Sequence, residues 1–132
     1  MAWLGINMDG IQYRVRVVYD TYADTFTLIE GPAADDMLNN RHERDLVGTS
    51  AVYEMGVEPD PAHPEDFDAF YASIRSPVNS HKITVFDGQN ELTYDAMITT
   101  GRRVFKGILS SLRQYGGSVI QFIPIQPQWE AT

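Results

Sequence analysis

Histidines and carboxylates are the side chains of this chain best suited to acid–base or metal chemistry. The three histidines, His42, His63 and His81, fall in different parts of the chain, and none lies one helical turn from another. Metal ligands commonly show such regular spacing, so the sequence predicts no metal site and no cofactor. The acids that follow Pro59 lack the alternation and central glycine of a calcium loop. Their place at the start of an expected helix, where the helix dipole favours negative charge, explains them.

Two short segments match catalytic motifs only in part. Arg41–Asp45 carries the His and Asp of a kinase-like catalytic loop, but no glycine-rich phosphate loop or lysine strand accompanies it. Gly48–Val52 places Ser50 as in a nucleophile elbow, but Val52 stands where that turn needs its second glycine. The sequence therefore predicts a protein that is not an enzyme.

The composition limits the remaining classes of protein. The chain has 132 residues, no cysteine and a formal net charge of −8, which fits one domain over residues 1–132 without disulfides or thiol chemistry. The negative charge argues against a nucleic-acid binder that relies on general attraction to phosphates. No apolar run approaches the roughly 20 residues of a membrane span, and the first residues do not form a signal peptide. We expect neither sequence-specific nucleic-acid binding nor membrane insertion, and a cytoplasmic site of synthesis and assembly.

Alternating apolar and polar residues predict that strands make up most of the chain. From Ile11 to Val17 every second residue is apolar, as in a strand with one buried face. Gly48 and Gly56 within a later strand predict bulges or close backbone approaches. We expect a mainly β, sandwich-like or barrel-like domain of about eight strands, joined by turns at Met8–Gly10, Asp20–Asp24, Asp87–Asn90 and Gly116–Gly117. These strands are expected near residues 3–7, 11–19, 25–30, 46–58, 81–86, 91–98, 102–109 and 118–125.

One helix is predicted, approximately from Pro64 to Ser76. Proline suits the first helical position, and the acids after it favour the positive end of the helix dipole. Apolar residues recur at helical spacing and form one stripe, and Pro77 ends the helix. That stripe, which must be buried against the sheet, consists of Phe67, Phe70, Tyr71 and Ile74.

Charge is unevenly distributed along the chain. An acidic edge in residues 54–68 has no Lys or Arg, and its acids are Glu54, Glu58, Asp60, Glu65, Asp66 and Asp68. A basic edge in residues 102–113 has no acid, and its cations are Arg102, Arg103, Lys106 and Arg113. We expect the two edges to lie on opposite sides of the subunit and to meet between subunits, in a head-to-tail contact that closes into a ring.

The polar segment from Gly31 to Asp45 predicts a long loop that reaches a neighbouring subunit. It shows no sustained period, and loops of this length inside a domain commonly have a function. Met37 and Leu38 are its large apolar residues and the expected anchors of this assembly loop, and Arg41 and Arg44 supply its positive charge.

Exposed aromatic residues would suit an alternative function, a small β-sandwich module that recognises a carbohydrate or a peptide. The candidates for such a stacking platform are Trp3, Trp129, Tyr53, Tyr71, Tyr94 and Tyr115. Their scattered positions at strand spacing are more typical of core or interface residues.

The order of elements and several local sequences resemble phage tail proteins. Segments similar to small prophage tail-region proteins of about this length are Ile6–Tyr13, Ile29–Pro32, Glu58–Pro61 and Asp66–Tyr71. Segments similar to the close of the tail-tube-like domain of distal tail (baseplate hub) proteins of long-tailed phages are Phe105–Ile108, Gly116–Val119 and Gln121–Pro127.

This resemblance implies a β-sandwich with a flanking helix that assembles into a hexameric ring around a channel for DNA. An acidic channel surface would keep the passing duplex from binding. The implied partners are further copies of the chain and other tail proteins, and the implied location is the virion tail after assembly in the host cytoplasm. The chain differs from a full distal tail protein because it lacks a C-terminal carbohydrate-binding-like domain, so tube, hub and accessory rings all stay open.

Overall fold

The computed structural model describes residues 3–30, 37–38, 41–42 and 46–130. Within these ranges the chain forms one helix, α1 (Pro64–Ile74), and eleven strands. The strands are β1 (Trp3–Met8), β2 (Ile11–Glu30), β3 (Met37–Leu38), β4 (Arg41–His42), β5 (Leu46–Pro59), β6 (His81–Asp87), β7 (Asn90–Met97), β8 (Phe105–Leu109), β9 (Leu112–Tyr115), β10 (Ser118–Pro124) and β11 (Trp129–Glu130). The expected mainly β fold with a single flanking helix is confirmed.

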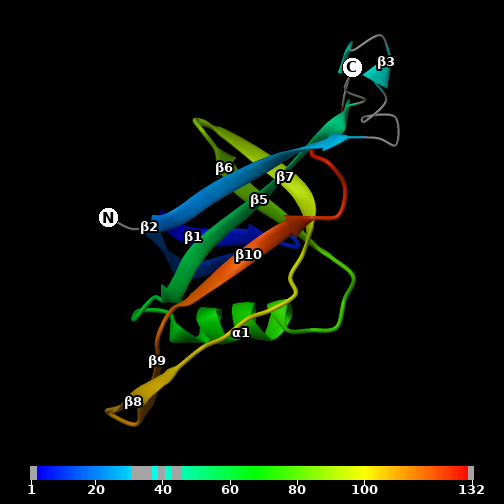
Figure 1. Ribbon diagram of the computed structural model, residues 1–132. Coiled ribbons are helices and arrows are strands. Elements are labelled where there is room, and N and C mark those ends of the chain that lie inside the picture. Colours follow the sequence, from blue (N-terminus) through cyan, green and yellow to red (C-terminus); the bar gives the residue numbers. More distant parts are fainter. Residues whose placement is uncertain (1–2, 31–36, 39–40, 43–45, 131–132) are drawn as a thin grey trace.

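Six antiparallel strands close into a barrel (Figure 1). Their order is β10, β7, β6, β1, β2 and β5, and β10 also pairs with β5, which joins the two ends of the sheet. β10 achieves this by pairing with β5 along Ser118–Phe122 and with β7 at Ile123–Pro124. The short β11 pairs with Gly48 and Thr49 of β5, on the same edge of β5 as β10 and opposite β2. Barrel closure removes free edges from most of the sheet.

The Asp-Gly steps of the sequence form turns as expected. Asp9 and Gly10 have positive φ angles of 55° and 80°, which suits a tight hairpin between β1 and β2. The Asp9 carboxylate also accepts a hydrogen bond of 2.8 Å from the backbone N–H of Lys82 and lies 2.6 Å from Nδ1 of His81. These contacts fix the β1–β2 turn against β6.

The predicted turn at Asp20–Asp24 is wrong, because β2 continues through it as one strand of 20 residues. The register against β5 shifts between Val18 and Ala23, so the surplus residues form a bulge. The Thr21 hydroxyl stabilises this bulge by donating to Val18 O at 2.7 Å and accepting from Gly56 N–H at 2.6 Å. A Cβ on residue 56 would lie 2.7 Å from that hydroxyl, so the expected close approach at Gly56 is confirmed.

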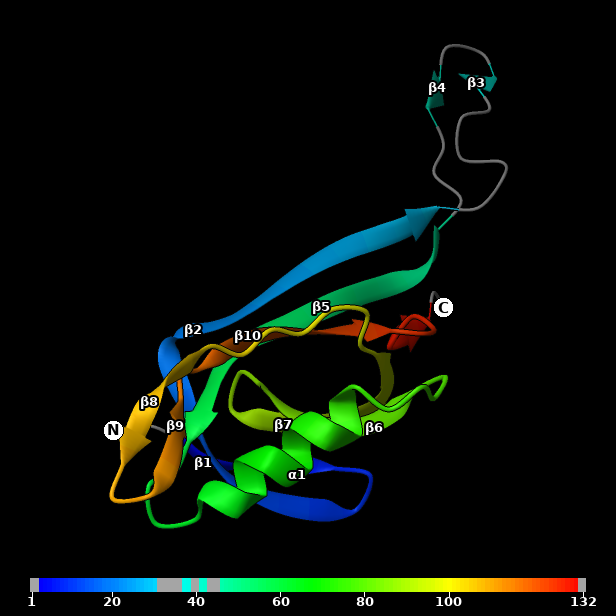
Figure 2. The ribbon, with the colours of Figure 1, turned by 90° about the horizontal axis from the view of Figure 1, so that it is seen from below.

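Helix α1 covers the barrel core with the predicted stripe (Figure 2). Phe67, Phe70 and Ile74 are buried, and Tyr71 packs partly against the same core. The Phe70 ring meets Tyr13 of β2 edge-to-face at 5.6 Å. The helix begins at Pro64 as expected and ends about two residues earlier than predicted.

Strands β8 and β9 form a separate hairpin that the sequence predicted only in part. The expected strand 102–109 shortens to β8, and Leu112–Tyr115 pairs with it as β9. The turn between them uses Ser110 and Ser111, both at positive φ, in place of the usual Asn or Gly. The two serines do not match the Asn-Gly or Asp-Gly pattern of such turns, so the sequence does not predict this hairpin.

Candidate interaction surfaces

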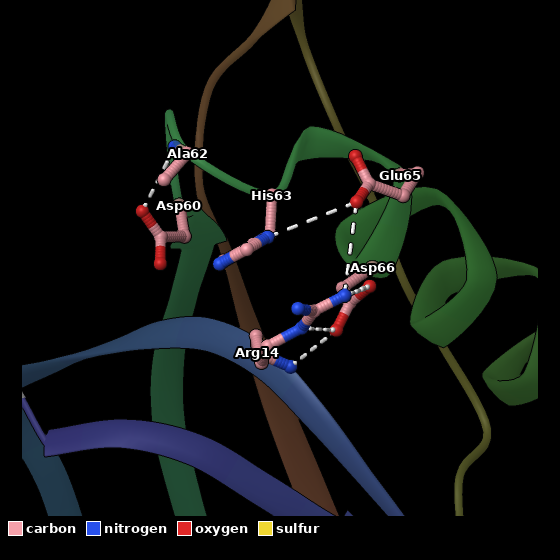
Figure 3. Close-up of polar contacts among 6 residues, drawn as sticks. All are labelled: Arg14, Asp60, Ala62, His63, Glu65 and Asp66. Carbon is pink, nitrogen blue, oxygen red and sulfur yellow. Dashed lines mark hydrogen bonds and ion pairs between the residues drawn. The ribbon is translucent and has the colours of Figure 1, made fainter.

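The acidic edge is anchored to the barrel through Arg14 of β2 (Figure 3). The Arg14 guanidinium donates from Nε to Asp66 Oδ2 at 2.9 Å and from Nη2 to Oδ1 at 3.1 Å. The backbone N–H of Arg14 donates to the same carboxylate at 2.8 Å. These hydrogen bonds lower the pKa of Asp66 to about 2. Asp66 therefore joins the first turn of α1 to β2.

Other acids of the same edge also have partners within the chain. Glu65 lies 3.7 Å from Arg14 Nη2, and Glu58 lies 3.6 Å from Arg16 Nε. Asp60 accepts a hydrogen bond from the backbone N–H of Ala62, and Glu54 accepts one from Gln121. A large part of this negative charge is thus compensated inside the subunit.

The two charged edges meet within one chain, so the expectation that they lie on opposite sides is wrong. Arg103 Nη1 lies 3.3 Å from Asp68 Oδ1. Its guanidinium also lies 4.4 Å from the Tyr71 ring centroid and 4.6 Å from that of Tyr115. The segment after β7 runs alongside α1, which brings Arg103 to the helix (Figure 2). Arg103 therefore joins α1 to the base of the β8–β9 hairpin.

The rest of the basic edge faces solvent. Arg102, Lys106 and Arg113 are exposed, and none has a carboxylate of the described residues at ion-pair distance. Lys106 and Arg113 belong to the β8–β9 hairpin, which projects away from the barrel (Figure 1). The hairpin also exposes four large apolar side chains, Phe105, Ile108, Leu109 and Leu112. This projection thus combines apolar surface with positive charge.

A groove of about 1100 Å³ separates the hairpin from the start of α1. Its lining carries both signs of charge, with the acids Glu58, Glu65 and Asp68 and the cations Arg16, Arg75, Arg103 and Arg113. The groove is open and polar as well as apolar, so it suits an extended chain with charged side chains better than a small apolar ligand.

The outer part of β2 forms a second projecting surface, which the sequence does not predict. We call residues 18–30 of β2 the β2 extension. Its outer part pairs with β5 as far as Glu30 with Leu46, beyond Val17, the last residue of β2 that pairs with the described part of β1. It rises out of the barrel (Figures 1 and 2). The large apolar side chains exposed there are Tyr19, Phe26 and Leu28. The alternation of Phe26 and Leu28 with threonines signals the strand, but only the structure shows that these residues lie outside the core.

The predicted assembly loop lies largely outside the described residues. Within Gly31–Asp45, the backbones of Met37–Leu38 and Arg41–His42 form a short antiparallel pair. The side chains of these residues, and Arg44 altogether, lie outside the described part of the chain. The role of Met37, Leu38, Arg41 and Arg44 in assembly stays a prediction.

The five candidate aromatic residues whose side chains the structure describes do not form a shared stacking platform, and the side chain of Trp3 lies outside the described part. Tyr53 and Tyr94 are buried in the barrel core, with ring centroids 6.0 Å apart, and burial raises the pKa of both phenols. Tyr71 and Tyr115 flank Arg103, and Trp129 is exposed on β11. Tyr53 and Tyr94 thus occupy the core positions that their spacing favoured.

Among the described residues, no three His, Asp or Glu side chains lie close enough together to hold a metal ion. Within the same ranges, α1 is too short and too polar to cross a membrane.

Comparisons of the chain with protein-family models, with curated proteins and with solved structures find no match.

Proposed function

We propose that this protein is a structural subunit of a phage or prophage tail, which self-assembles into a ring at the tail tube or baseplate hub. The ring is a hexamer around a channel for DNA, as the sequence resemblance implies. Its partners are further copies of the chain and the neighbouring tail proteins. The protein acts by binding and assembly, without a catalytic step.

The β2 extension is the observation that carries this proposal. An exposed strand edge is a template for pairing with another chain, and monomeric proteins protect such edges with charged side chains, Pro or bulges. Residues 25–29, which follow the bulge at Val18–Ala23, contain no charged residue, Pro or Gly, and they expose Phe26 at 65% of its surface. An unprotected strand edge of this kind supports a protein that is built to meet other subunits.

The charge of the chain is compatible with a channel for DNA. The net charge of −8 gives a surface that repels phosphates, so a duplex would pass without sticking. Lys106 and Arg113 of the β8–β9 hairpin have no ion-pair partner among the described residues, so they are available for contacts between subunits.

Sedimentation velocity over a wide range of protein concentrations, followed by electron microscopy of the assembled fraction, tests the proposal. The expected result is a single large species whose population rises with protein concentration. In electron microscopy it should appear as rings of one diameter with a central hole. A monomer at every concentration, or aggregates without a defined subunit number, would contradict it.

A second function, recognition of a peptide, is favoured by the groove between α1 and the hairpin. Charges of both signs along its walls would select an extended peptide with acidic and basic side chains. Nuclear magnetic resonance titration with a mixed-charge peptide library distinguishes the two functions. Saturable shifts at Arg103 and Tyr115 in a protein that stays monomeric would favour the binding module.

A further inference from the structure

The outer edge of the β2 extension has no strand partner within the described part of the chain. β1 pairs with β2 only as far as Val17, and β5 occupies the opposite side of residues 23–30. On the edge that faces away from β5, alternate backbone N–H and C=O groups of residues 23–29 therefore have no strand partner among the described residues and can pair with a further strand. The edge is rich in Thr, Phe, Leu and Ile, which favour strand pairing.

The β8–β9 hairpin also has strand edges and apolar surface without a partner in the described part of the chain. A hairpin of two strands is marginally stable in water unless another element covers it. Its base is held by the Phe105–Tyr115 ring contact at 5.6 Å and by Arg103. Towards its tip, Ile108 and Leu109 are each exposed at 68%. The hairpin thus presents both an apolar surface and strand edges without a partner among the described residues.

The charges of the two projections are opposite. The β2 extension carries Asp20, Asp24 and Glu30 and no cation, whereas residues 102–115 carry four cations and no acid. Asp20 and Asp24 are exposed on the extension, and Lys106 and Arg113 are exposed on the hairpin. Opposite charge on two apolar, strand-forming surfaces favours their association and disfavours pairing of either surface with itself.

The two projections lie at opposite ends of the subunit. In two perpendicular views the hairpin and the outer end of β2 point away from the barrel in different directions (Figures 1 and 2). They do not meet within one chain. A contact between them therefore needs a second copy, and it is head-to-tail, which generates a ring when the rotation closes.

We propose that the β8–β9 hairpin of one copy lies along the β2 extension of the next copy and continues its sheet. This contact specifies how neighbouring subunits of the proposed ring meet, and it rests on the proposed function. Strand pairing satisfies the open backbone groups, and burial of Phe26, Ile108 and Leu109 removes exposed apolar surface. Lys106 and Arg113 then lie near Asp20 and Asp24 and set the orientation of the two subunits.

Cross-linking between single-cysteine variants tests this contact, because the chain has no cysteine of its own. Phe26→Cys and Ile108→Cys variants are mixed under assembling conditions and treated with a short bis-maleimide. The matched control replaces Ile108→Cys with Val78→Cys, at an exposed position in the loop after α1. The expected result is a strong cross-linked dimer for the first pair and only a trace for the control.

Charge reversal tests the orientation independently. The Lys106→Glu/Arg113→Glu variant and the Asp20→Lys/Asp24→Lys variant should each raise the concentration for half-assembly on the order of tenfold or more. An equimolar mixture of the two variants should restore assembly. The negative hairpin of the first variant then meets the positive extension of the second, and the natural hairpin of the second meets the natural extension of the first. Circular dichroism and thermal unfolding of each variant alone check that the subunit is folded.

The possible outcomes separate this contact from the proposed function. If the protein forms rings but the Phe26→Cys and Ile108→Cys pair links no better than the control, the contact is wrong and ring assembly stands. A mixture of the charge variants that assembles no better than either variant alone also overturns the contact. If the natural chain stays monomeric at every concentration, the proposed function fails, and the contact fails with it.

Discussion

The Arg103 guanidinium lies 3.3 Å from the Asp68 carboxylate, and this ion pair joins the basic and acidic edges inside a single subunit. Because Arg103 also stacks on Tyr71 and Tyr115, it holds the β8–β9 hairpin against α1. Reversing its charge would disturb the subunit itself. Lys106 and Arg113, exposed on the same hairpin, are therefore the better positions for testing contacts between subunits.

Replacing Arg103 with Met should lower the free energy of unfolding by about 1–2 kcal/mol, because two cation–π contacts and one partly exposed ion pair are lost. Urea unfolding of the natural and variant chains measures the difference. Lys82→Met, which changes an exposed cation on β6, is the matched control and should stay within about 0.5 kcal/mol. Equal losses in the two variants would show that Arg103 does not hold the hairpin.

Replacing Phe70 with Ala should cost about 3–5 kcal/mol of stability, because the ring is only 1% exposed and its removal leaves a cavity beneath the helix. Phe26→Ala removes the same side chain from the exposed β2 extension and should change monomer stability by about 0.5 kcal/mol or less. Chemical unfolding of both variants at a concentration that keeps them monomeric makes the comparison. A loss below about 1 kcal/mol at Phe70 would mean that α1 does not seal the core.

The Arg14–Asp66 contact predicts a loss of stability in acid. The pKa of Asp66 is lowered in the folded protein from 3.8 to about 2, so folding favours the ionised carboxylate. Its contribution is full above about pH 4 and is lost as the pH falls towards 2. The melting temperature of Asp66→Asn should lie below that of the natural chain at pH 6, and the gap should close between pH 4 and 2.

Asp95→Asn, at an exposed position on β7, is the control for this titration. Its melting temperature should follow that of the natural chain across the same pH range. A gap between Asp66→Asn and the natural chain that stays constant down to pH 2 would exclude titration of Asp66 as its cause.

Ser111 has a φ of 67° in the hairpin turn, a conformation that favours glycine. Ser111→Gly should therefore stabilise the β8–β9 hairpin by about 1 kcal/mol and slow hydrogen exchange of its amides about fivefold. Thr100→Gly, in the segment before the hairpin and without a positive φ, should give no such slowing. Unchanged exchange in Ser111→Gly would mean that the turn does not limit opening of the hairpin.

Local chemistry was enough to predict the helix and most strands. Pro64, the acids after it and the apolar stripe specify α1 without information from the rest of the chain. The alternation from Ile11 to Val17 likewise specifies a strand with one buried face. The Asp-Gly steps specify two of the hairpin turns.

The long β2 strand and the meeting of the charged edges depend on contacts between distant residues. The residues at Asp20–Asp24 favour a turn locally, but the Thr21 hydroxyl bonds to Gly56, 35 positions away, and makes a bulge instead. Arg103 reaches Asp68 because the segment after β7 runs alongside α1. No charge pattern along the sequence specifies how this segment packs against α1. The sequence alone therefore predicts, wrongly, that the two charged edges lie apart.

Hydrogen exchange of the β2 extension in the free and assembled protein tests the central claim most directly. The claim predicts that amides of residues 23–29 on the edge away from β5 exchange rapidly in the monomer and become protected on assembly. Amides of residues 105–115 should become protected at the same time. Amides of β10 report on the closed barrel and should be protected in both states. Rings in which residues 23–29 exchange as fast as in the monomer would contradict the claim.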